Sequence, residues 1–233
     1  MLIMGLPHRK AEHMSLAVPG QARRDRSSTM DTVAAAVMDI RAGRPVIVVD
    51  DEDRENEGDL IMAAEHATAR ALAFYMRHTS GLICAPMPSE LADRLRLAPM
   101  VQDNEDPAET AYTVSVDAVE GIESGISAAD RAHTLRVLAD PATTASALCR
   151  PGHVFPLRAR SGGLAERRGH TEAAVELLRL AGLSPVAVIS EVCNDDGSVA
   201  RLPQLRTLAD RQWLKIVSIE QLAALAHQPT AAL

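Results

Sequence analysis

The chain is expected to fold as one α/β domain around a largely internal, mixed β-sheet, and three features of the sequence predict this. Segments with helical spacing of apolar residues alternate with short β-branched runs along most of the 233 residues. Two apolar runs that flank an acidic segment are close enough to form a hairpin, which gives the sheet antiparallel as well as parallel pairs. The sequence has no internal repeat, and no linker is long enough to divide it.

The first helix is expected from Thr29 onwards, because Val33, Ala36, Val37 and Ile40 recur at helical spacing and Gly43 suits a C-terminal cap. Ser127-Ala-Ala-Asp130 has the form of a capping box and predicts a helix that ends near residue 138. The other predicted helices are 68–78, 88–95, 171–182, 204–211 and 219–227. The predicted strands are 46–49, 60–64, 82–86, 112–116, 153–159, 186–192 and 215–219, with a loop at 100–111 and a turn at 194–197.

Composition excludes several classes of protein. The 31 acidic and 24 basic residues give a net charge of −7, which argues against a nucleic-acid partner. Aromatic residues make up 2% of the chain, too few for base-stacking surfaces. No apolar run approaches the roughly 18–20 residues of a membrane span. The three cysteines lack metal-type spacing and are an odd number, so a reducing cytoplasm is the expected location.

We expect three segments along the chain: an N-terminal extension at 1–28, the domain at 29–228 and a short tail at 229–233. The extension contains proline, glycine and a basic patch without periodicity, which is typical of a disordered tail. An upstream start codon is an alternative, because Met14 and Met30 could each begin the chain.

The densest chemical signal is the acidic run 50–59, in which seven of ten residues are carboxylates. Concentrated like charge is costly unless cations neutralise it, and oxygen ligands at a strand end suit Mg²⁺. Arg54, inside the run, could anchor a phosphate or its acidic neighbours. A solvated acidic turn is the alternative.

A second signal surrounds His153, which follows Pro151-Gly152 and precedes an apolar strand. An imidazole held at a strand entrance suits a general acid or base, although a hydrogen-bonded structural histidine is the alternative. Arg150 and Arg158 on either side could hold a phosphate.

The segment 167–172 comes just before a predicted helix, whose first N–H groups and positive dipole end favour a phosphate. His170 in this segment could be a metal ligand. Glu191 lies inside an otherwise apolar strand, so it is either paired or has a raised pKa, and both make it a site candidate. A salt bridge that fixes the core is the alternative for Glu191, and a buried structural thiol is the favoured interpretation of Cys84.

Taken in order, these motifs closely resemble the 3,4-dihydroxy-2-butanone 4-phosphate synthase family of riboflavin biosynthesis. The resemblance covers about residues 30–225 and rests most on Asp-Glu-Asp-Arg-Glu-Asn-Glu-Gly-Asp at 51–59 and Arg-Pro-Gly-His-Val-Phe-Pro-Leu-Arg at 150–158. Supporting motifs are Arg-His-Thr-Ser-Gly at 77–81, Gly-Ile-Ser-Ala-Ala-Asp-Arg at 125–131, Gly-His-Thr-Glu-Ala at 169–173 and Asn-Asp-Asp-Gly at 194–197. The chain resembles the single-function form, because it stops where fused members continue into GTP cyclohydrolase II.

The resemblance implies a three-layer α/β/α sandwich around a twisted sheet and a homodimer with its sites near the interface. It implies a carbon–carbon lyase that converts D-ribulose 5-phosphate to L-3,4-dihydroxy-2-butanone 4-phosphate and formate with Mg²⁺ or Mn²⁺, two ions per site. Glu55 and His170 would bind the metal, and His153 and Glu191 would be catalytic. The substrate would contact the set Arg54, Glu55, Asp59, Arg167, Arg168, Gly169, His170, Thr171 and Glu191.

Three departures from the family pattern concern the loop and the phosphate. The loop at 102–111 is more acidic than expected, Tyr112 stands where Phe is usual, and Arg168 occupies a small-residue position. Two other functions fit part of the pattern: a metal-dependent phosphosugar isomerase or aldolase, and a divalent-ion-binding protein without catalysis. An ion binder needs neither His153 nor Glu191, and both are present.

Overall fold

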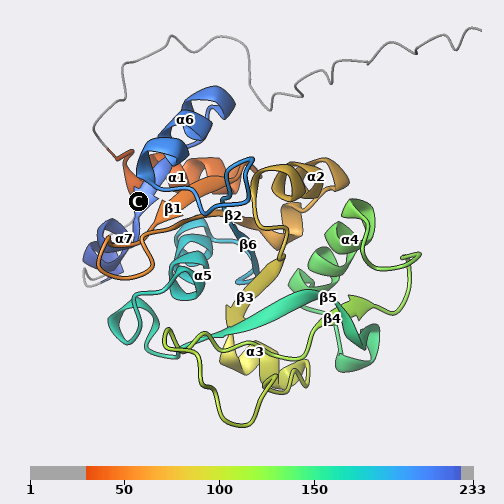
Figure 1. Ribbon diagram of the computed structural model, residues 1–233. Coiled ribbons are helices and arrows are strands. Elements are labelled where there is room, and N and C mark those ends of the chain that lie inside the picture. The colour runs from red at the N-terminus through yellow and green to blue at the C-terminus, as the bar shows by residue number, and fades with distance from the viewer. Residues whose placement is uncertain (1–29, 227–233) are drawn as a thin grey trace, which may run out of the picture.

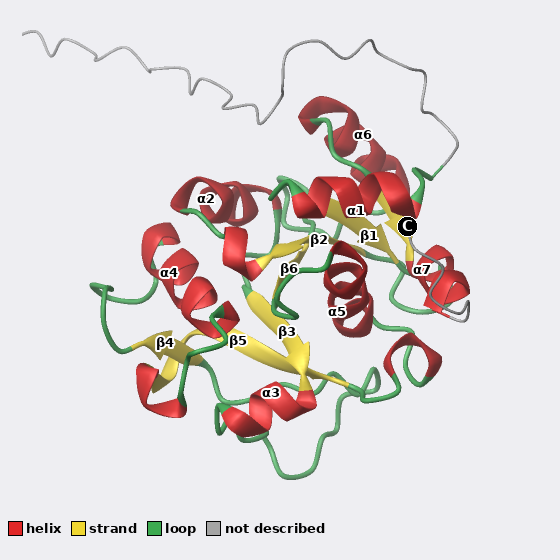
Figure 2. Ribbon diagram, turned by 180° about the vertical axis from the view of Figure 1, so that it is seen from behind, coloured by secondary structure: helices red, strands yellow, loops and turns green. Residues whose placement is uncertain are grey.

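The computed structural model describes residues 30–226, in which helices cover both faces of a seven-stranded sheet (Figures 1 and 2). The predicted extension (1–28) and tail (229–233) lie outside the described residues, as do both ends of the predicted domain.

The sheet is mixed, as predicted, with the strand order β4-β5-β3-β6-β2-β1-β7. Strand β1 pairs in parallel with β7, and β3 with β5, while the other neighbours are antiparallel. The predicted hairpin is confirmed, because β1 and β2 pair antiparallel with Val46 opposite Ile61. The strands are β1 (Val46–Val49), β2 (Gly58–Ala63), β3 (Cys84–Pro88), β4 (Val116–Ala118), β5 (Leu148–Ala159), β6 (Ala187–Glu191) and β7 (Ile216–Ser218).

Two hydrophobic clusters, one on each face of the sheet, confirm the three-layer sandwich. Helices α1 (Val33–Arg41), α5 (His170–Ala181) and α7 (Ile219–Ala226) pack on one face. Helices α2 (Ala69–His78), α4 (Ala128–Ala139) and α6 (Leu202–Gln212) pack on the other. A shorter helix, α3 (Ser89–Arg94), follows β3, and three 3₁₀ turns, η1 (Ala64–His66), η2 (Ala145–Ala147) and η3 (Gly163–Ala165), complete the described elements.

Side-chain caps fix where several helices begin. Ser127 Oγ accepts a hydrogen bond from the backbone N–H of Asp130 at 3.0 Å, as the capping pattern predicts. Thr32 and Thr68 cap α1 and α2 in the same way. Helix α5 ends at Gly182, whose φ of 69° is the left-handed conformation that glycine adopts without strain.

The structure corrects the sequence prediction around β4 and β5. The expected strand at 112–116 forms only isolated bridges at Tyr112 and Thr113, and β4 begins at Val116. Strand β5 begins at Leu148, so Pro151-Gly152 is not a turn before the strand but part of a bulge within it. The pairing changes from Asp117 opposite Cys149 to Val116 opposite Val154, which leaves residues 150–153 as the bulge.

Candidate active site

A cavity of about 250 Å³ opens beside the acidic loop, the N-terminus of α5 and the end of β6. Seven residues that the sequence analysis proposed line it together. They are Arg54, Glu55, Asp59, Arg167, His170, Thr171 and Glu191. The fold therefore brings three separate sequence segments to one place.

The carboxylate of Asp50 holds the acidic loop in place by accepting hydrogen bonds from it. Its Oδ1 accepts a hydrogen bond from the backbone N–H of Glu57 at 2.7 Å, and its Oδ2 accepts from the backbone N–H of Glu55 at 3.0 Å. Arg54 Nη1 donates to the same Oδ2 at 2.9 Å and also to Glu55. Asn56, between them, has a left-handed φ of 54°. These bonds hold Glu55 and Glu57 toward the cavity, so the run is an organised loop and not a solvated turn.

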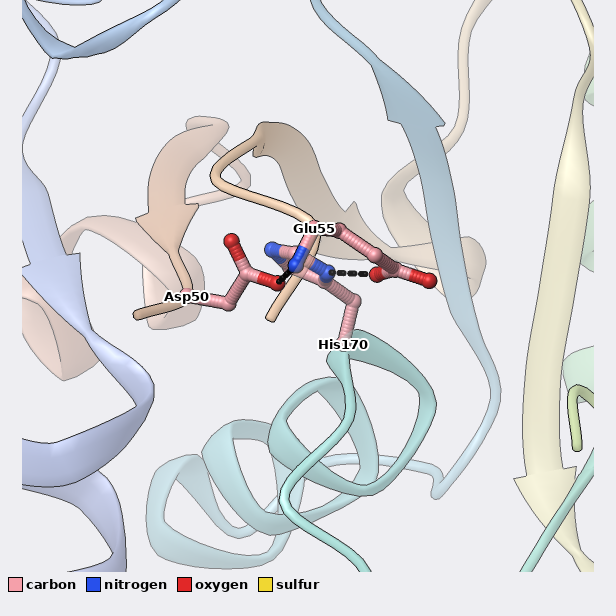
Figure 3. Close-up of side chains that lie close together, drawn as sticks. All are labelled: Asp50, Glu55 and His170. Carbon is pink, nitrogen blue, oxygen red and sulfur yellow. Dashed lines mark hydrogen bonds and ion pairs between the residues drawn. The ribbon is translucent and has the colours of Figure 1, made fainter. Parts of the chain in front are cut away.

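His170 is the first residue of α5 and is buried against the end of β1. Its Nε2 lies 3.2 Å from the carbonyl oxygen of Val48, which makes Nε2 the donor and turns Nδ1 toward the acidic loop. Nδ1 lies 3.8 Å from Glu55 Oε2 (Figure 3). One ligand atom each from Asp50, Glu55 and His170 lie within 4.8 Å of one another.

Asp59 and Glu191 stand directly opposite each other on the paired strands β2 and β6. Two carboxylates in this position repel each other, which destabilises the pair unless a positive group lies between them. Burial raises the pKa of Asp59 to about 7 against the attraction of His170, and Glu191 contributes to the rise. Asp59 Oδ1 is buried and has no hydrogen-bond partner among the described residues. Ser80 Oγ donates to Glu191 Oε2 at 2.7 Å.

The same electrostatic interactions shift the pKa values of the other charged groups at the site. Burial alone would lower the pKa of His170, but Asp59, Glu55 and Asp50 together raise it to about 9. His170, whose Nδ1 is 3.8 Å away, is the main cause that lowers the pKa of Glu55, whereas burial and the charge of Glu55 raise the pKa of Glu57. The surrounding carboxylates thus favour the positively charged form of the His170 imidazole.

These groups fit divalent cations. The site offers a buried carboxylate oxygen without a partner on Asp59, a second carboxylate on Glu55 and an imidazole fixed by its Nε2–H bond. Mn²⁺ accepts ligands of all these kinds, and Mg²⁺ binds the carboxylates together with water. Both oxygens of Asp50 are already occupied by backbone N–H groups, so Asp50 supports the loop while Glu55 and His170 face the cavity.

Arg167 lines the cavity, but its guanidinium already has partners. Nη1 donates to Glu172 Oε2 at 2.7 Å in a buried ion pair. Nε and Nη2 donate to the carbonyl oxygen of Ala108, and Nη2 also to Thr110. Arg167 therefore ties the loop 100–111 to the beginning of α5.

Gly169 is the N-cap residue of α5 and is buried, and Arg168 is exposed. Neither lines the cavity as the described residues form it. A Cβ on Gly169 would lie 1.9 Å from Arg167 Nη1, so the glycine makes room for the ion pair.

His153 lies on the bulge of β5 and does not line the cavity that contains Glu191. Its Nδ1 is 2.7 Å from Asp117 Oδ2, and its backbone N–H donates to Asp117 Oδ1 at 2.9 Å. Asp117 is buried, whereas the His153 side chain is 41% exposed. The imidazole is thus oriented by a buried carboxylate and faces outward.

The two arginines that flank His153, suggested from the sequence as phosphate ligands, do not line this cavity, and their side chains bond to other parts of the chain. Arg150 donates to the carbonyl oxygens of Ala145, Leu148 and Leu95. Arg158 donates to Leu97 and pairs with Asp93 at 2.7 Å. Both arginines stabilise the turns around β5.

The sequence analysis missed several residues that line the cavity. Asp106 and Thr110 come from the loop 100–111, which has no periodicity to place it in the fold. Cys84 and Tyr112 also line it, and burial raises the pKa of both side chains. The departure at Tyr112 from the family pattern was the only signal that this position matters.

The fold is a three-layer α/β domain in which opposed carboxylates at the ends of two interior strands lie beside a buried histidine and a helix N-terminus. These features define a protein suited to divalent cations and a small anionic ligand. Comparison with known proteins gives the particular family. The profile of the 3,4-dihydroxy-2-butanone 4-phosphate synthase family matches residues 34–225, and the chain belongs to that family.

Individual relatives agree with this assignment. Riboflavin biosynthesis protein RibBA of Salinispora arenicola is 56% identical over 197 residues, which are 84% of this chain and 47% of that protein. A crystal structure of a 3,4-dihydroxy-2-butanone 4-phosphate synthase in complex with two magnesium ions has a TM-score of 0.82 and 48% identity, covering 84% of this chain and 97% of that one. The synthase of Candida albicans has a TM-score of 0.80 and 45% identity, covering 86% and 100%.

The chain spans about half the length of the curated relatives it matches. Across residues 30–226, no helix has the length and apolar character needed to cross a membrane.

Proposed function

We propose that this chain is a lyase of riboflavin biosynthesis that converts D-ribulose 5-phosphate to L-3,4-dihydroxy-2-butanone 4-phosphate and formate. The observation that carries the proposal is the convergence of Glu55, Asp59, His170 and Glu191 on one cavity at the N-terminus of α5. The family assignment and the likeness to a synthase solved with two magnesium ions support it.

Glu55 and His170 would hold the divalent cation, Mg²⁺ or Mn²⁺, with two ions per site. When bound, such cations polarise the carbonyl and hydroxyl oxygens of a ketose and stabilise an enediolate. Asp50 keeps Glu55 in place, and the Val48 carbonyl keeps Nδ1 of His170 directed at Glu55. The charge of the opposed carboxylates of Asp59 and Glu191 would be compensated in the same cavity.

Glu191 is the proposed base for a proton on a substrate carbon. Its Oε2 is held by Ser80, so the carboxylate has a fixed orientation at the end of β6. Asp59, opposite, has a pKa of about 7 in the cation-free protein, which suits a group that exchanges protons near neutral pH. The repeated proton transfers of the reaction need more than one such group.

The phosphate would lie at the N-terminus of α5, where Thr171 is buried at the cavity wall. Arg54 supplies a positive charge nearby. Arg167 acts by fastening the loop 100–111 over this end of the cavity, since Glu172, Ala108 and Thr110 occupy its donors. Gly169 and Arg168 would contribute through the backbone and the local charge at this helix end.

We propose that the protein works as a homodimer and that His153 acts in the cavity of the other subunit. His153 is oriented by Asp117 but lies outside the cavity of its own chain. Phe155, two residues further on the same face of β5, is only partly buried. A second copy against this face would cover Phe155 and bring an imidazole to a site near the interface.

Mixing two inactive variants tests this arrangement. His153→Gln and Glu191→Gln are each expected to lack activity while keeping the native circular dichroism spectrum. After the two are unfolded and refolded together, half of the dimers are mixed, and each mixed dimer has one complete site if His153 acts across the interface. Activity near a quarter of wild type is therefore expected. No recovery, with mixed dimers shown by native mass spectrometry, would place His153 in its own subunit's site or outside catalysis.

The reaction itself is tested by formate release from the purified chain given D-ribulose 5-phosphate, with Mg²⁺ and with EDTA. One formate per substrate consumed, only with the metal, is the expected result. Consumption without formate would favour a phosphosugar isomerase or aldolase. Metal binding without consumption would indicate a divalent-ion-binding protein that has no catalysis.

We also propose a cytoplasmic location, on the argument that the three cysteines are all free. The net charge of −7 supports a small-molecule substrate and no nucleic-acid partner. The single-function form stays a prediction, because the curated relatives named RibBA are about twice as long as the matched region. The mass of the native protein in a cell extract tests it.

A further inference from the structure

A second cavity, of about 280 Å³, lies between helices α1, α2 and α6. It opens where Gly43–Pro45 leads from α1 into β1 and where the residues after α6 lead into β7. Figures 1 and 2 show these three helices gathered on the same side of the molecule. Its volume is near the lower end of the range for small-molecule sites.

This cavity is separate from the candidate active site. It borders Pro45, just before β1, whereas Asp50 follows the other end of the same strand. Four residues of strand put about 13 Å between the two ends. No residue lines both cavities. A ligand here would not compete directly with one in the candidate active site.

Positive groups predominate in the lining, although the chain as a whole has a net charge of −7. Arg44, Arg70 and Lys215 line the cavity, and Asp39 is the one carboxylate among its described lining residues. Asp39 is paired with Arg44, and Lys215 Nζ lies 3.4 Å from Asp31. Three cationic residues and one carboxylate therefore line the cavity, and when Asp31 outside the lining is counted the local excess is one positive charge, which favours an anionic ligand.

The N-terminus of α2 adds to this field. Thr68, its N-cap residue, lines the cavity, and the first turn of α2 contains no acidic residue. The N–H groups at this end point out of a ten-residue helix and carry its partial positive charge. Arg70 stands on the same turn. A phosphate between Arg70 and this helix end would meet two independent positive features.

Two polar atoms in the wall lack partners. Gln212 Oε1 and His66 Nε2 are buried, and neither makes a hydrogen bond within residues 30–226; the carboxylate of Glu65 is 3.8 Å from His66 Nε2. A buried polar atom without a partner costs free energy unless a ligand or water satisfies it. A rotation of the Gln212 side-chain amide would present its oxygen to a ring N–H or a hydroxyl group in the cavity.

The side chain of Trp213 indicates what the part of the ligand beyond the phosphate is. Trp213 is the one tryptophan in the sequence, lines the cavity and is 38% exposed. Its backbone has a left-handed φ of 60° at the end of α6, which turns the chain sharply from the helix toward β7. An exposed indole beside a cationic cavity provides a face on which a planar ring stacks.

We propose that this cavity binds a planar heteroaromatic ring that carries a phosphate, the chemistry shared by nucleoside monophosphates and flavin mononucleotide. The phosphate lies near Arg70 and the N-terminus of α2, the ring stacks on Trp213, and a ring or sugar donor meets Gln212. The proposal does not depend on the reaction catalysed at the other cavity.

Trp213 is its own reporter, because no other tryptophan contributes to the fluorescence of the full chain. The probes are AMP and flavin mononucleotide, each with its phosphate-free counterpart, adenosine or riboflavin, and inorganic phosphate. We expect saturable quenching by at least one ring phosphate, with its dissociation constant from calorimetry unchanged by Mg²⁺ or EDTA. The phosphate-free counterpart is expected to bind at least about tenfold more weakly, since it lacks the charge-assisted bonds.

Two arginine variants provide the matched comparison. Arg70→Gln is expected to weaken binding about tenfold or more, and Arg211→Gln, an exposed arginine of α6 that does not line the cavity, by less than about twofold. Trp213→Phe should weaken the binding of the ring phosphate but not the binding of inorganic phosphate. The proposal is overturned if neither ring phosphate binds with a dissociation constant below about 1 mM, or if Arg70→Gln and Arg211→Gln have equal effects. Competition by D-ribulose 5-phosphate would likewise overturn it, by placing the binding in the other cavity.

Discussion

Replacing Gly169 with alanine should loosen the candidate active site through one ion pair. The added Cβ would lie 1.9 Å from Arg167 Nη1 and 2.8 Å from Glu172 Oε2. The end of an arginine side chain moves easily, so the overlap itself is relieved at little cost. What is lost is the pair between Arg167 and Glu172, whose side chains are 14% and 1% exposed.

The size of the effect follows from the burial of Glu172. Removing the partner of a buried charge costs about 3–5 kcal/mol, and Glu172 keeps one bond from the backbone N–H of Arg160, so we expect about 3 kcal/mol. For a domain of this size that corresponds to a fall in Tm of about 6–12 °C. Arg167 would also release the carbonyl oxygen of Ala108, which frees the loop 100–111.

Thermal unfolding and limited proteolysis of the loop measure both consequences. Arg167→Ala provides the comparison, because it removes the same pair without the added methyl group. In the double variant, Gly169→Ala should cost about 1 kcal/mol or less beyond Arg167→Ala, as two changes that break one interaction are not additive. If Gly169→Ala unfolds within about 0.5 kcal/mol of wild type, or if the two costs simply add, the reasoning is wrong.

Three further predictions concern the chemistry. His170 has a pKa of about 9 without a cation, so a cation that binds Nδ1 must displace a proton. Between about pH 7 and 9 the apparent affinity for Mn²⁺ should therefore rise about tenfold per pH unit. Calorimetry in buffers of different ionisation enthalpy should show about one proton released at pH 8. His170→Asn should abolish the release, and a wild-type value near zero would exclude Nδ1 as a ligand. Glu191→Gln should reduce formate release by at least about a hundredfold. Its Tm should not fall, because the change removes the repulsion between Glu191 and Asp59. Full activity would remove Glu191 from the mechanism. Asp117→Asn should lower kcat at least about tenfold with little change in KM, because Nδ1 of His153 loses its carboxylate partner at 2.7 Å. An unaltered kcat would mean that the pair of His153 and Asp117 has only a structural role.

The order of elements was predictable because local signals dominate it. Thr68 and Ser127 cap helices where the pattern indicates, and the β-branched run 46–49 is a fully buried strand. The errors lie where pairing between distant segments decides. The bulge at 150–153 exists because Val116 and Asp117 of β4 pair on either side of it, and nothing within residues 150–153 specifies that partner.

The site was predictable to the extent that its residues belong to dense motifs. Glu55, His170 and Glu191 come from three such motifs, and the sheet brings them together. Asp106 and Thr110 come from an aperiodic loop whose position depends on Arg167, so only the tertiary structure places them in the cavity. The engagement of Arg167 with Glu172 was also invisible, because Glu172 reads as an ordinary acidic residue in the first turn of a helix.

The strand pairing between β2 and β6 gives a physical reason why the proposed site would need a cation. Register fixes Asp59 opposite Glu191, and the same register keeps the neighbouring side chains of both strands in the core, so the strands cannot shift to separate the two carboxylates. In the cation-free protein the repulsion is reduced in two ways: Asp59 takes up a proton near pH 7, and His170 holds its own proton up to about pH 9. A divalent cation bound by the proposed ligands would supply the two positive charges that these two protons otherwise provide. The fold therefore accepts a local loss of stability at a rigid pair of strands. A cation held by Glu55 and His170, as proposed, would relieve it beside the group proposed to remove a proton from the substrate.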